Sequence, residues 1–382
     1  MFNANDSLWM AQALKLAEQG LYTTSPNPRV GCVLTINNKL IGSGWHQRAG
    51  EPHAEVYALR EAGNAARDAT AYVTLEPCSH YGRTPPCADA LIAAGVARVV
   101  VAMQDPNPLV AGQGIAKLRA AGINVECGLM EAAARELNIG FVSRMTRGTP
   151  WVRSKTGMSL DGRTALANGV SQWITGDAAR RDVQHWRARS CAVLTGIGTV
   201  LADDPQLNVR ESMPTSTAES LLSPPLTRGG REGLRQPLRV VLDSRLRMPP
   251  DARMLQSDGK VLIYTAAQHA EKIAALEQAG ATVCVLPDGS GQVALPAVLR
   301  DLAQRGCNEV LLEAGSTLNG AMLRAGLVDE LLLYVAPQLL GDAARGIAAL
   351  GELTSLEQRV NLEWQDVRQI GNDLRITARV KR

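Results

Sequence analysis

This chain carries three side chains of the kind that bind zinc, in three separate segments. They place the strongest limit on how the chain can fold. His53 stands in the triplet HAE, and Cys78 and Cys87 each follow a proline. Imidazole nitrogen and thiolate sulfur are ligands that zinc prefers, and three protein ligands with an open fourth position are typical of catalytic zinc sites. We therefore expect a fold that brings these three segments together.

Local patterns predict that the three residues lie at the ends of secondary structure. Residues 71–75 (AYVTL) have the composition of a buried strand that ends just before Cys78. The prolines before His53 and Cys87 can each occupy the first turn of a helix, and a glycine is placed to end each of these helices. Cys87 is then expected at a helix N-terminus, where the helix dipole favours the thiolate.

Glu55, two residues after His53, is the candidate general acid/base. Two thiolates and a neutral imidazole cancel the charge of Zn²⁺, so such a metal should acidify its water less than an all-histidine site would. A protein carboxylate is then needed to move protons. This set of groups is typical of hydrolytic deaminases. A structural zinc would need a fourth ligand, for which Cys32 and His80 are the nearby spare residues.

The spacing of the two cysteines departs from the usual pattern. The common deaminase signature has about two residues between its cysteines, whereas Ser79–Pro86 (SHYGRTPP) separates them here. This insertion is polar and rich in turn residues, so we expect it to line the substrate pocket rather than to pack in a core.

Composition narrows the class of protein. The chain has 382 residues and a net charge of +3, without a run of lysine and arginine typical of nucleic-acid binding. Its seven cysteines are dispersed, which favours a reducing compartment over a disulfide framework. The first residues lack the design of a signal peptide, and no stretch of about 18 apolar residues occurs. We expect a cytoplasmic enzyme with no nucleic-acid or membrane partner.

The chain is long enough for more than one domain. Apolar strands alternate with helical segments in both halves, which predicts two α/β domains, over residues 1–145 and 150–382. The polar segment 143–150 (SRMTRGTP) is expected to be the linker. Residues 212–237 are rich in Ser, Thr, Pro, Gly and Arg, and we interpret them as a flexible surface insertion without a catalytic role.

The second half contains a candidate anion site. Glu313 ends an apolar strand, and the following GSTLNG places glycine and hydroxyl residues at the start of a helix. Such a turn can bind the phosphate of a nucleotide, although taken alone it is more often structural. No G-x-G-x-x-G sequence is present, so the turn is not a Rossmann fingerprint. The arginines of 180–189 are interpreted as a solvated helix face by default.

Several segments resemble the bifunctional deaminase/reductase family of riboflavin biosynthesis. They are TSPNPRVGCV, HAE, PCSHYGRTPPC, SLDGRTA, SQWIT, TVLADDP and EAGSTLNGAML. The long cysteine spacer is the most specific of these. The resemblance extends over the whole chain apart from 212–237. It implies a cytidine-deaminase-like α/β/α domain followed by a dihydrofolate-reductase-like α/β domain.

The resemblance also implies the chemistry. The first domain would use one Zn²⁺ to hydrolyse an amino group from a diaminopyrimidinone ribosylamino phosphate. The second would use NADPH to reduce the ribosyl chain of the resulting aminouracil to ribityl. The family implies small phosphorylated pyrimidine substrates and a homo-oligomer.

Site residues are transferred from the family only where a motif matches. Its zinc ligands correspond to His53, Cys78 and Cys87, and its proton shuttle to Glu55. Deaminase substrate positions correspond to Asn27, His46, His80 and Arg83, which argues against His80 as a metal ligand. Reductase substrate positions correspond to Lys155, Ser171, Arg187, Asp203, Leu207, Arg210 and Glu313. Cofactor positions correspond to Gly157, Trp173, Thr199, Asp203, Ser244, Gly315, Ser316, Thr317, Leu318, Asn319, Gly320 and Ala321.

Two alternatives stay open at this point. A nucleoside or tRNA deaminase with an appended domain would show no NADPH turnover, and for tRNA it would need a basic surface that the composition does not suggest. A non-catalytic metal-binding regulator would have no use for the acid/base Glu55.

Overall fold

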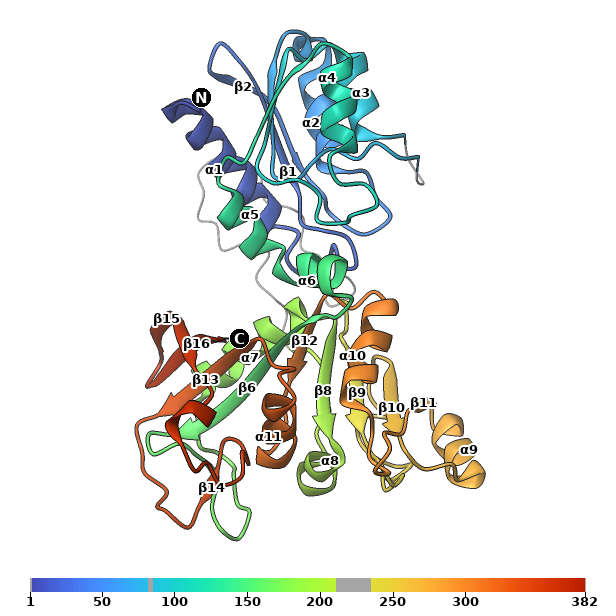
Figure 1. The fold of residues 1–382 in the computed structure, drawn as a ribbon, viewed down its shortest axis with the longest axis vertical. Helices are drawn as coiled ribbons and strands as arrows, with labels where there is room; N and C mark the ends of the chain where they lie inside the picture. The colour runs from blue at the N-terminus through green and yellow to red at the C-terminus, as the bar shows by residue number, and fades with distance from the viewer. Residues whose placement is uncertain (1, 82–84, 211–234, 382) are drawn as a thin grey trace. The chain divides into compact units, whose positions relative to one another are not determined.

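The computed structural model describes residues 2–81, 85–210 and 235–381 (Figure 1). The predicted substrate residue Arg83 and most of the predicted insertion 212–237 lie outside this part of the chain. The chain divides into two compact units, residues 1–149 and 150–382. Among the described residues, none of the helices has both the length and the apolar character needed to cross a lipid bilayer.

The first unit is built on a five-stranded sheet in the order β2-β1-β3-β4-β5. The strands are β1 (Gly31–Ile36), β2 (Lys39–Trp45), β3 (Thr70–Val73), β4 (Arg98–Val101) and β5 (Asn124–Cys127). β1 runs antiparallel to both β2 and β3, whereas β3, β4 and β5 are parallel. Cys78 lies in the loop after the carboxyl end of β3, where sites usually form in open α/β sheets, and His53 lies between β2 and the helix that follows it.

Helices cover both faces of this sheet. They are α1 (Ala4–Glu18), α2 (Ala54–Ala62), α3 (Cys87–Ala94), α4 (Gln113–Ala120), α5 (Glu131–Leu137) and α6 (Ile139–Arg147), with a short 3₁₀ turn, η1 (Gly63–Ala66). Because side chains of a strand alternate between faces, Cys32 and Leu34 of β1 pack with α2, α3 and α4, and Val33 packs with α1. The result is the predicted three-layer arrangement of helices, sheet and helices.

Two glycines of β2 allow α2 to approach the sheet closely. A Cβ on Gly42 would lie 2.3 Å from the Ala58 carbonyl oxygen, and one on Gly44 would lie 2.6 Å from that of Ala54. Any larger residue at these positions would push α2 away. The sheet therefore fixes the helix that begins directly after His53.

The second unit contains a nine-stranded sheet in the order β11-β10-β9-β8-β12-β6-β13-β16-β15. Its strands are β6 (Trp151–Ser159), β8 (Ala192–Gly196), β9 (Leu238–Leu242), β10 (Val261–Thr265), β11 (Ala281–Val285), β12 (Glu309–Leu312), β13 (Glu330–Ala336), β15 (Leu362–Ile370) and β16 (Asp373–Val380). Neighbours from β11 to β13 are parallel, and the β15–β16 hairpin joins β13 antiparallel. A small separate sheet pairs β7 (Arg163–Ala165) with β14 (Arg345–Gly346).

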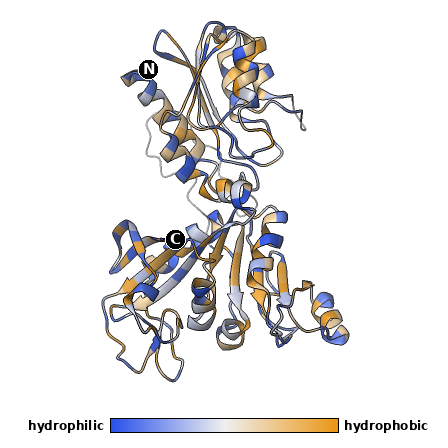
Figure 2. Ribbon diagram, in the orientation of Figure 1, coloured by the Kyte–Doolittle hydropathy of each residue, from blue (hydrophilic) through white to orange (hydrophobic). Residues whose placement is uncertain are grey.

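Helices of the second unit also pack on both faces. They are α7 (Asp177–Arg189), α8 (Ile197–Asp203), α9 (Ala270–Gln278), α10 (Leu295–Gln304) and α11 (Ser316–Arg324), with a 3₁₀ turn, η3 (Leu356–Gln358). Residues of α10 and α11 share one buried cluster, and residues of α7, α8 and α9 share the other. The strands of both sheets carry much of the hydrophobic colour in Figure 2.

The boundary between the two units falls within the predicted linker 143–150, but most of that segment is helical rather than turn-forming. Residues up to Arg147 complete α6, and only the last few residues before the second unit are non-helical. Phe141 and Ser143 of this helix are buried, and the Ser143 hydroxyl donates to the Thr149 carbonyl at 2.7 Å. The packing of its buried side therefore stabilises this segment as a helix, although its composition is polar.

Candidate active sites

The first unit brings His53, Cys78 and Cys87 together. His53 is the N-cap of α2, Cys78 lies in the loop after β3, and Cys87 is the first residue of α3. The His53 Nδ1 atom lies 3.6 Å from Cys78 Sγ and 3.3 Å from Cys87 Sγ, and all three ligand atoms lie within 4.8 Å of one another. Ligands of a tetrahedral zinc ion are separated by about 3.5 Å, so the three atoms fit one such ion.

The electrostatics of this cluster favour a metal ligand at Cys78. Hydrogen bonding with the Cys87 thiol, and then with His53, holds the pKa of the Cys78 thiol well below its usual range. The Cys87 amide also donates to Cys78 Sγ at 3.3 Å. Because the thiolate is the form that binds metal, the loop and the start of α3 prepare Cys78 for that role.

Glu55 is buried beside this cluster, in the first turn of α2. Its side chain is only 3% exposed, and its Oε2 atom has no hydrogen-bond partner among the described residues. Burial raises the pKa of Glu55. An unsatisfied buried carboxylate oxygen is costly, which points to a ligand or a water that interacts with it.

His46 and Asn27 form a fixed polar pair next to His53. The His46 Nδ1 atom lies 3.1 Å from the Pro52 carbonyl oxygen, which can only accept, so Nδ1 carries the proton. Nε2 then accepts from the Asn27 amide nitrogen at 3.1 Å. Burial lowers the pKa of His46, which favours this neutral form. The His46 and His53 rings meet edge to face, with centroids 5.3 Å apart. His80, by contrast, is exposed.

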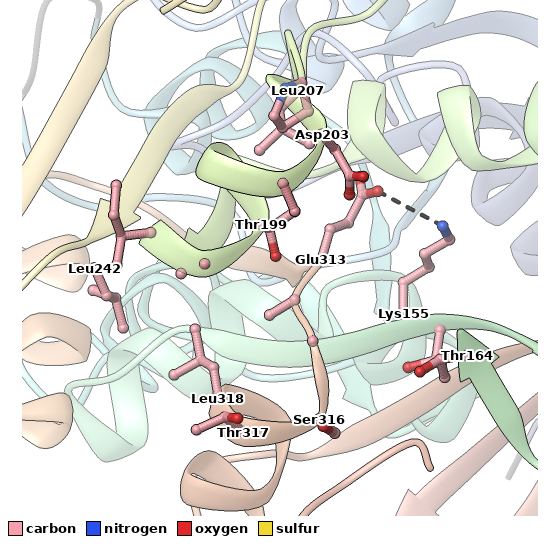
Figure 3. Close-up of a pocket in the computed structure, with 18 of the residues that line it drawn as sticks. Lys155, Thr164, Thr199, Asp203, Leu207, Leu242, Glu313, Ser316, Thr317 and Leu318 are labelled. Carbon is pink, nitrogen blue, oxygen red and sulfur yellow. Dashed lines mark ion pairs between the residues drawn. The ribbon is translucent and has the colours of Figure 1, made fainter. Parts of the chain in front are cut away.

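The second unit contains a cavity of about 1420 Å³ at the carboxyl ends of its parallel strands. This is larger than a typical pocket for one small ligand, about 300–1,000 Å³, so it has room for two ligands. Figure 3 shows residues of α8, α11 and β6 converging on it. The sequence-predicted residues that line it are Lys155, Gly157, Ser171, Trp173, Arg187, Thr199, Asp203, Leu207, Arg210, Ser244, Glu313, Gly315, Ser316, Thr317, Leu318 and Ala321.

Glu313 lines this cavity and forms ion pairs with two basic side chains. Its Oε1 accepts from Arg187 Nε at 2.6 Å, its Oε2 from Arg187 Nη2 at 3.0 Å, and Lys155 Nζ lies 3.7 Å from Oε2. Burial would raise the pKa of Glu313, but Arg187 and Lys155 outweigh it and hold this pKa at about 2. Burial lowers the pKa of Lys155 and raises that of Asp203. Glu313 is therefore an ionised carboxylate at neutral pH.

Two glycine turns lie side by side at the cavity. One joins β8 to α8 at Gly196 and the other joins β12 to α11 at Gly315. The strands β8 and β12 are parallel neighbours, and the Leu318 side chain lies 3.3 Å from where a Cβ on Gly196 would be. Amides at the start of helices favour anionic groups, so the paired turns suit a phosphorylated ligand.

Comparison with known proteins identifies the family. The RibD C-terminal domain model matches residues 150–376, and the model of the cytidine and deoxycytidylate deaminase zinc-binding region matches residues 3–103. Riboflavin biosynthesis protein RibD of Escherichia coli (strain K12) is 50% identical over 369 residues, which cover 97% of this chain and 98% of the relative. The chain belongs to the RibD family. The RibD of Haemophilus influenzae is 45% identical, with 98% of both chains covered.

Solved RibD structures agree with this assignment. Acinetobacter baumannii RibD superposes with a TM-score of 0.88 at 47% identity and covers 99% of each chain. A deaminase/reductase from Thermotoga maritima, described as acting on diaminohydroxyphosphoribosylaminopyrimidine and a phosphoribosylaminouracil, has a TM-score of 0.82 at 30% identity, again with 99% of each chain covered. The predicted family and the two predicted α/β domain types are confirmed.

Membership in the RibD family establishes the two activities. The chain is a bifunctional deaminase and reductase of riboflavin biosynthesis, with a zinc-dependent first domain and an NADPH-dependent second domain. The alternatives of a nucleoside or tRNA deaminase with an unrelated second domain, and of a non-catalytic regulator, do not account for the full-length match.

Two residues of the predicted cofactor run do not line the cavity. The buried Asn319 side chain donates to the carbonyls of Ala314 and Ile347, both at 3.1 Å. A Cβ on Gly320 would lie 2.2 Å from the Ala349 carbonyl oxygen. Asn319 and Gly320 therefore hold α11 against residues 347–349, whereas their neighbours face the cavity.

Proposed function

We propose that this chain removes an amino group from a diaminopyrimidinone ribosylamino phosphate and then reduces the ribosyl chain of the aminouracil product. The observation that carries this proposal is the cluster of His53, Cys78 and Cys87 beside the buried Glu55, in a chain that also holds a large cavity suited to anions. We assign deamination to residues 1–145 and reduction to 150–382, supported by the two domain matches.

In the deaminase, His53, Cys78 and Cys87 would hold the metal. Zinc bound there supplies Lewis-acid activation of the water that attacks the pyrimidine carbon. Glu55 would take one proton from the attacking water and deliver it to the ring nitrogen. It would then take the second proton, from the hydroxyl formed on the pyrimidine carbon, and deliver it to the amino group, which leaves as ammonia. The unpartnered Oε2 of Glu55 supports this role, because it is free to take and release protons at the site.

Substrate positioning in the deaminase is assigned to Asn27, His46, His80 and Arg83, as the family motifs imply, and Arg83 lies outside the described residues. The Pro52 carbonyl fixes the tautomer of His46, and His46 in turn orients the Asn27 amide. A fixed amide gives one arrangement of donor and acceptor toward a pyrimidine edge, which favours one base over others.

In the reductase, NADPH supplies the hydride for C1′ of the ring-opened ribosyl group. We propose that the glycine turns and Ser244 contact the cofactor, and that Lys155, Arg187 and Glu313 orient the substrate. The low pKa of Glu313 argues against it as a proton donor at neutral pH. Lys155 and Asp203 are then the candidate donors, and Lys155→Met and Asp203→Asn would separate them by their rates of NADPH oxidation.

We further propose a cytoplasmic homo-oligomer. Seven free cysteines support a reducing compartment. The edge strand β15 carries Trp364 and Val367 that are 65% and 56% exposed, which supports an association surface. Light scattering during size-exclusion chromatography tests the oligomer, and a monomer at micromolar concentration would contradict it.

The decisive experiment supplies the diaminopyrimidinone ribosylamino phosphate and NADPH to the purified zinc-loaded chain. We expect ammonia release followed by NADPH oxidation in equal amounts. Release of ammonia without NADPH oxidation would refute the reductase assignment, and the absence of both would refute the proposed substrate.

A further inference from the structure

A buried carboxylate that none of the assigned roles uses lies two residues before Cys78. Glu76 is 6% exposed and follows β3 in the loop that carries the cysteine. Its carboxylate accepts four backbone hydrogen bonds, all between 2.8 and 3.2 Å. The donors are the amides of Asp105, Gly112, Gly114 and Ile115. Hydrogen bonds to an ionised acceptor are among the stronger ones in proteins.

These donors belong to one continuous part of the chain. Asp105 lies in the loop after β4, and Gly114 and Ile115 lie in the first turn of α4. The amides of a helix's first turn have no partner within the helix, and Glu76 supplies two of them with acceptors. The Glu76 carboxylate therefore ties the loop that contains Cys78 to two elements that are distant in sequence.

Backbone packing reinforces the same attachment. A Cβ on Gly114 would lie 1.9 Å from the Pro77 carbonyl oxygen, so α4 meets the loop directly at the residue between Glu76 and Cys78. The Glu76 amide also donates to the Met103 carbonyl at 3.0 Å. Glu76 and Pro77 are therefore held by contacts that do not involve the other two metal ligands. The next residue, Cys78, is held in addition by the first turn of α3, because its carbonyl accepts from the Ala88 amide at 3.1 Å.

We propose that Glu76 is a positioning residue that holds Cys78 in place to bind zinc together with His53 and Cys87. This inference rests on the proposed zinc site. Without the four hydrogen bonds the loop can move away from α4, and Cys78 Sγ then leaves the arrangement in which it lies 3.6 Å from His53 Nδ1. The effect is local to the deaminase, because all the contacts of Glu76 described above lie in the first unit.

The test compares zinc affinity in the native chain and in Glu76→Gln, measured by competition with a chromogenic chelator. The glutamine has the same size but replaces one acceptor oxygen with a donor that faces two amides. We expect a loss of zinc affinity of about 10- to 100-fold, the usual range for residues that orient metal ligands. The thiolate-to-metal absorption band of the Co²⁺-loaded chain should also change. NADPH oxidation with supplied aminouracil substrate should not change.

Asp6→Asn is the matched control. Asp6 is another buried carboxylate of the first unit, on α1 at the other face of the sheet, where it accepts from Tyr72 and Arg98. Asp6→Asn should lower the thermal midpoint and leave zinc affinity unchanged. Equal zinc affinity in Glu76→Gln and the native chain would overturn the inference. So would an equal loss in Asp6→Asn, because the effect would then be general destabilisation.

If the native chain itself binds no zinc, the proposed function fails. If Glu76→Gln does not fold its first unit, Glu76→Asp is measured in its place, since it keeps the charge but withdraws the carboxylate by one methylene. A weaker zinc complex in Glu76→Asp supports the inference, and an unchanged one overturns it.

Discussion

Replacement of Glu313 by glutamine should expose how much the reductase cavity depends on one buried charge. The neutral amide resembles the protonated carboxyl, so the variant removes the attraction to Arg187 and Lys155 with little change in size. Folding lowers the pKa of Glu313 from 4.5 to about 2. At about 1.4 kcal/mol per unit of pKa, this corresponds to about 3 kcal/mol of stability at neutral pH.

The pH dependence gives the sharper test. Because folding lowers the pKa of this acid, its stabilisation is complete above pH 4.5 and disappears as the pH falls through about 2. Urea unfolding of the second unit can be followed by tryptophan fluorescence in a background in which Trp9 and Trp45 are replaced by phenylalanine. The native chain should exceed Glu313→Gln in unfolding free energy by about 3 kcal/mol at pH 7, and this gap should shrink as the pH falls toward about 3.

Glu352→Gln changes an exposed carboxylate of the same unit and should leave the unfolding free energy unchanged at both pH values. A native-to-variant gap that persists undiminished at low pH would mean that the ion pairs of Glu313 do not produce it. Glu313→Gln should lose NADPH oxidation and keep ammonia release, since Glu313 lies in the cavity of the second unit.

Three other perturbations have expected outcomes. Glu55→Gln should retain zinc, measured by metal analysis. Its rate of ammonia release should fall by a factor of at least about 10², the usual contribution of a general acid/base. An undiminished rate would contradict the role of Glu55. Dialysis against a zinc chelator should abolish ammonia release and leave NADPH oxidation with supplied aminouracil intact, and loss of both activities would contradict separate sites. In Gly320→Ala the new Cβ would meet the Ala349 carbonyl and displace α11. The variant should lower the unfolding free energy of the second unit by about 1–3 kcal/mol in urea and raise the KM for NADPH. An unchanged KM would show that the site tolerates this displacement of α11.

Much of the deaminase centre could be predicted from the sequence because its signals are local. A proline before His53 and one before Cys87 mark helix starts, and the glycines that follow mark helix ends, at Gly63 and Gly95 in the structure. The edge hairpin β15–β16 of the second unit was not predicted. β15 has almost no buried residue, so it lacks the alternation of apolar and polar residues that identifies a half-buried strand.

Residues that act through contacts distant in sequence could not be found in the same way. Glu76 receives its four hydrogen bonds from residues 105–115, and nothing in the local sequence links the two segments. The strand, the loop and α4 meet only after the parallel strands β3 and β4 pair. A buried glutamate next to a metal-ligand motif is a usable signal only when its burial is known.

The run from Gly315 to Ala321 shows that the residues of one helical motif can have different surroundings in the structure. Family resemblance assigns all seven residues to the cofactor, yet α11 begins at Ser316 and turns about 100° per residue. Thr317 and Ala321 are four residues apart and share a face, as do Leu318 and Ala321, and these line the cavity. Periodicity alone would place Gly320 between Ser316 and Thr317, which also line the cavity. The packing of Asn319 and Gly320 on residues 347–349 is therefore seen only in the structure. Because a ligand on one side of a helix contacts only some of its side chains, Asn319 and Gly320 can serve the same site by holding α11 in place. Their assignment to the cofactor stays a prediction.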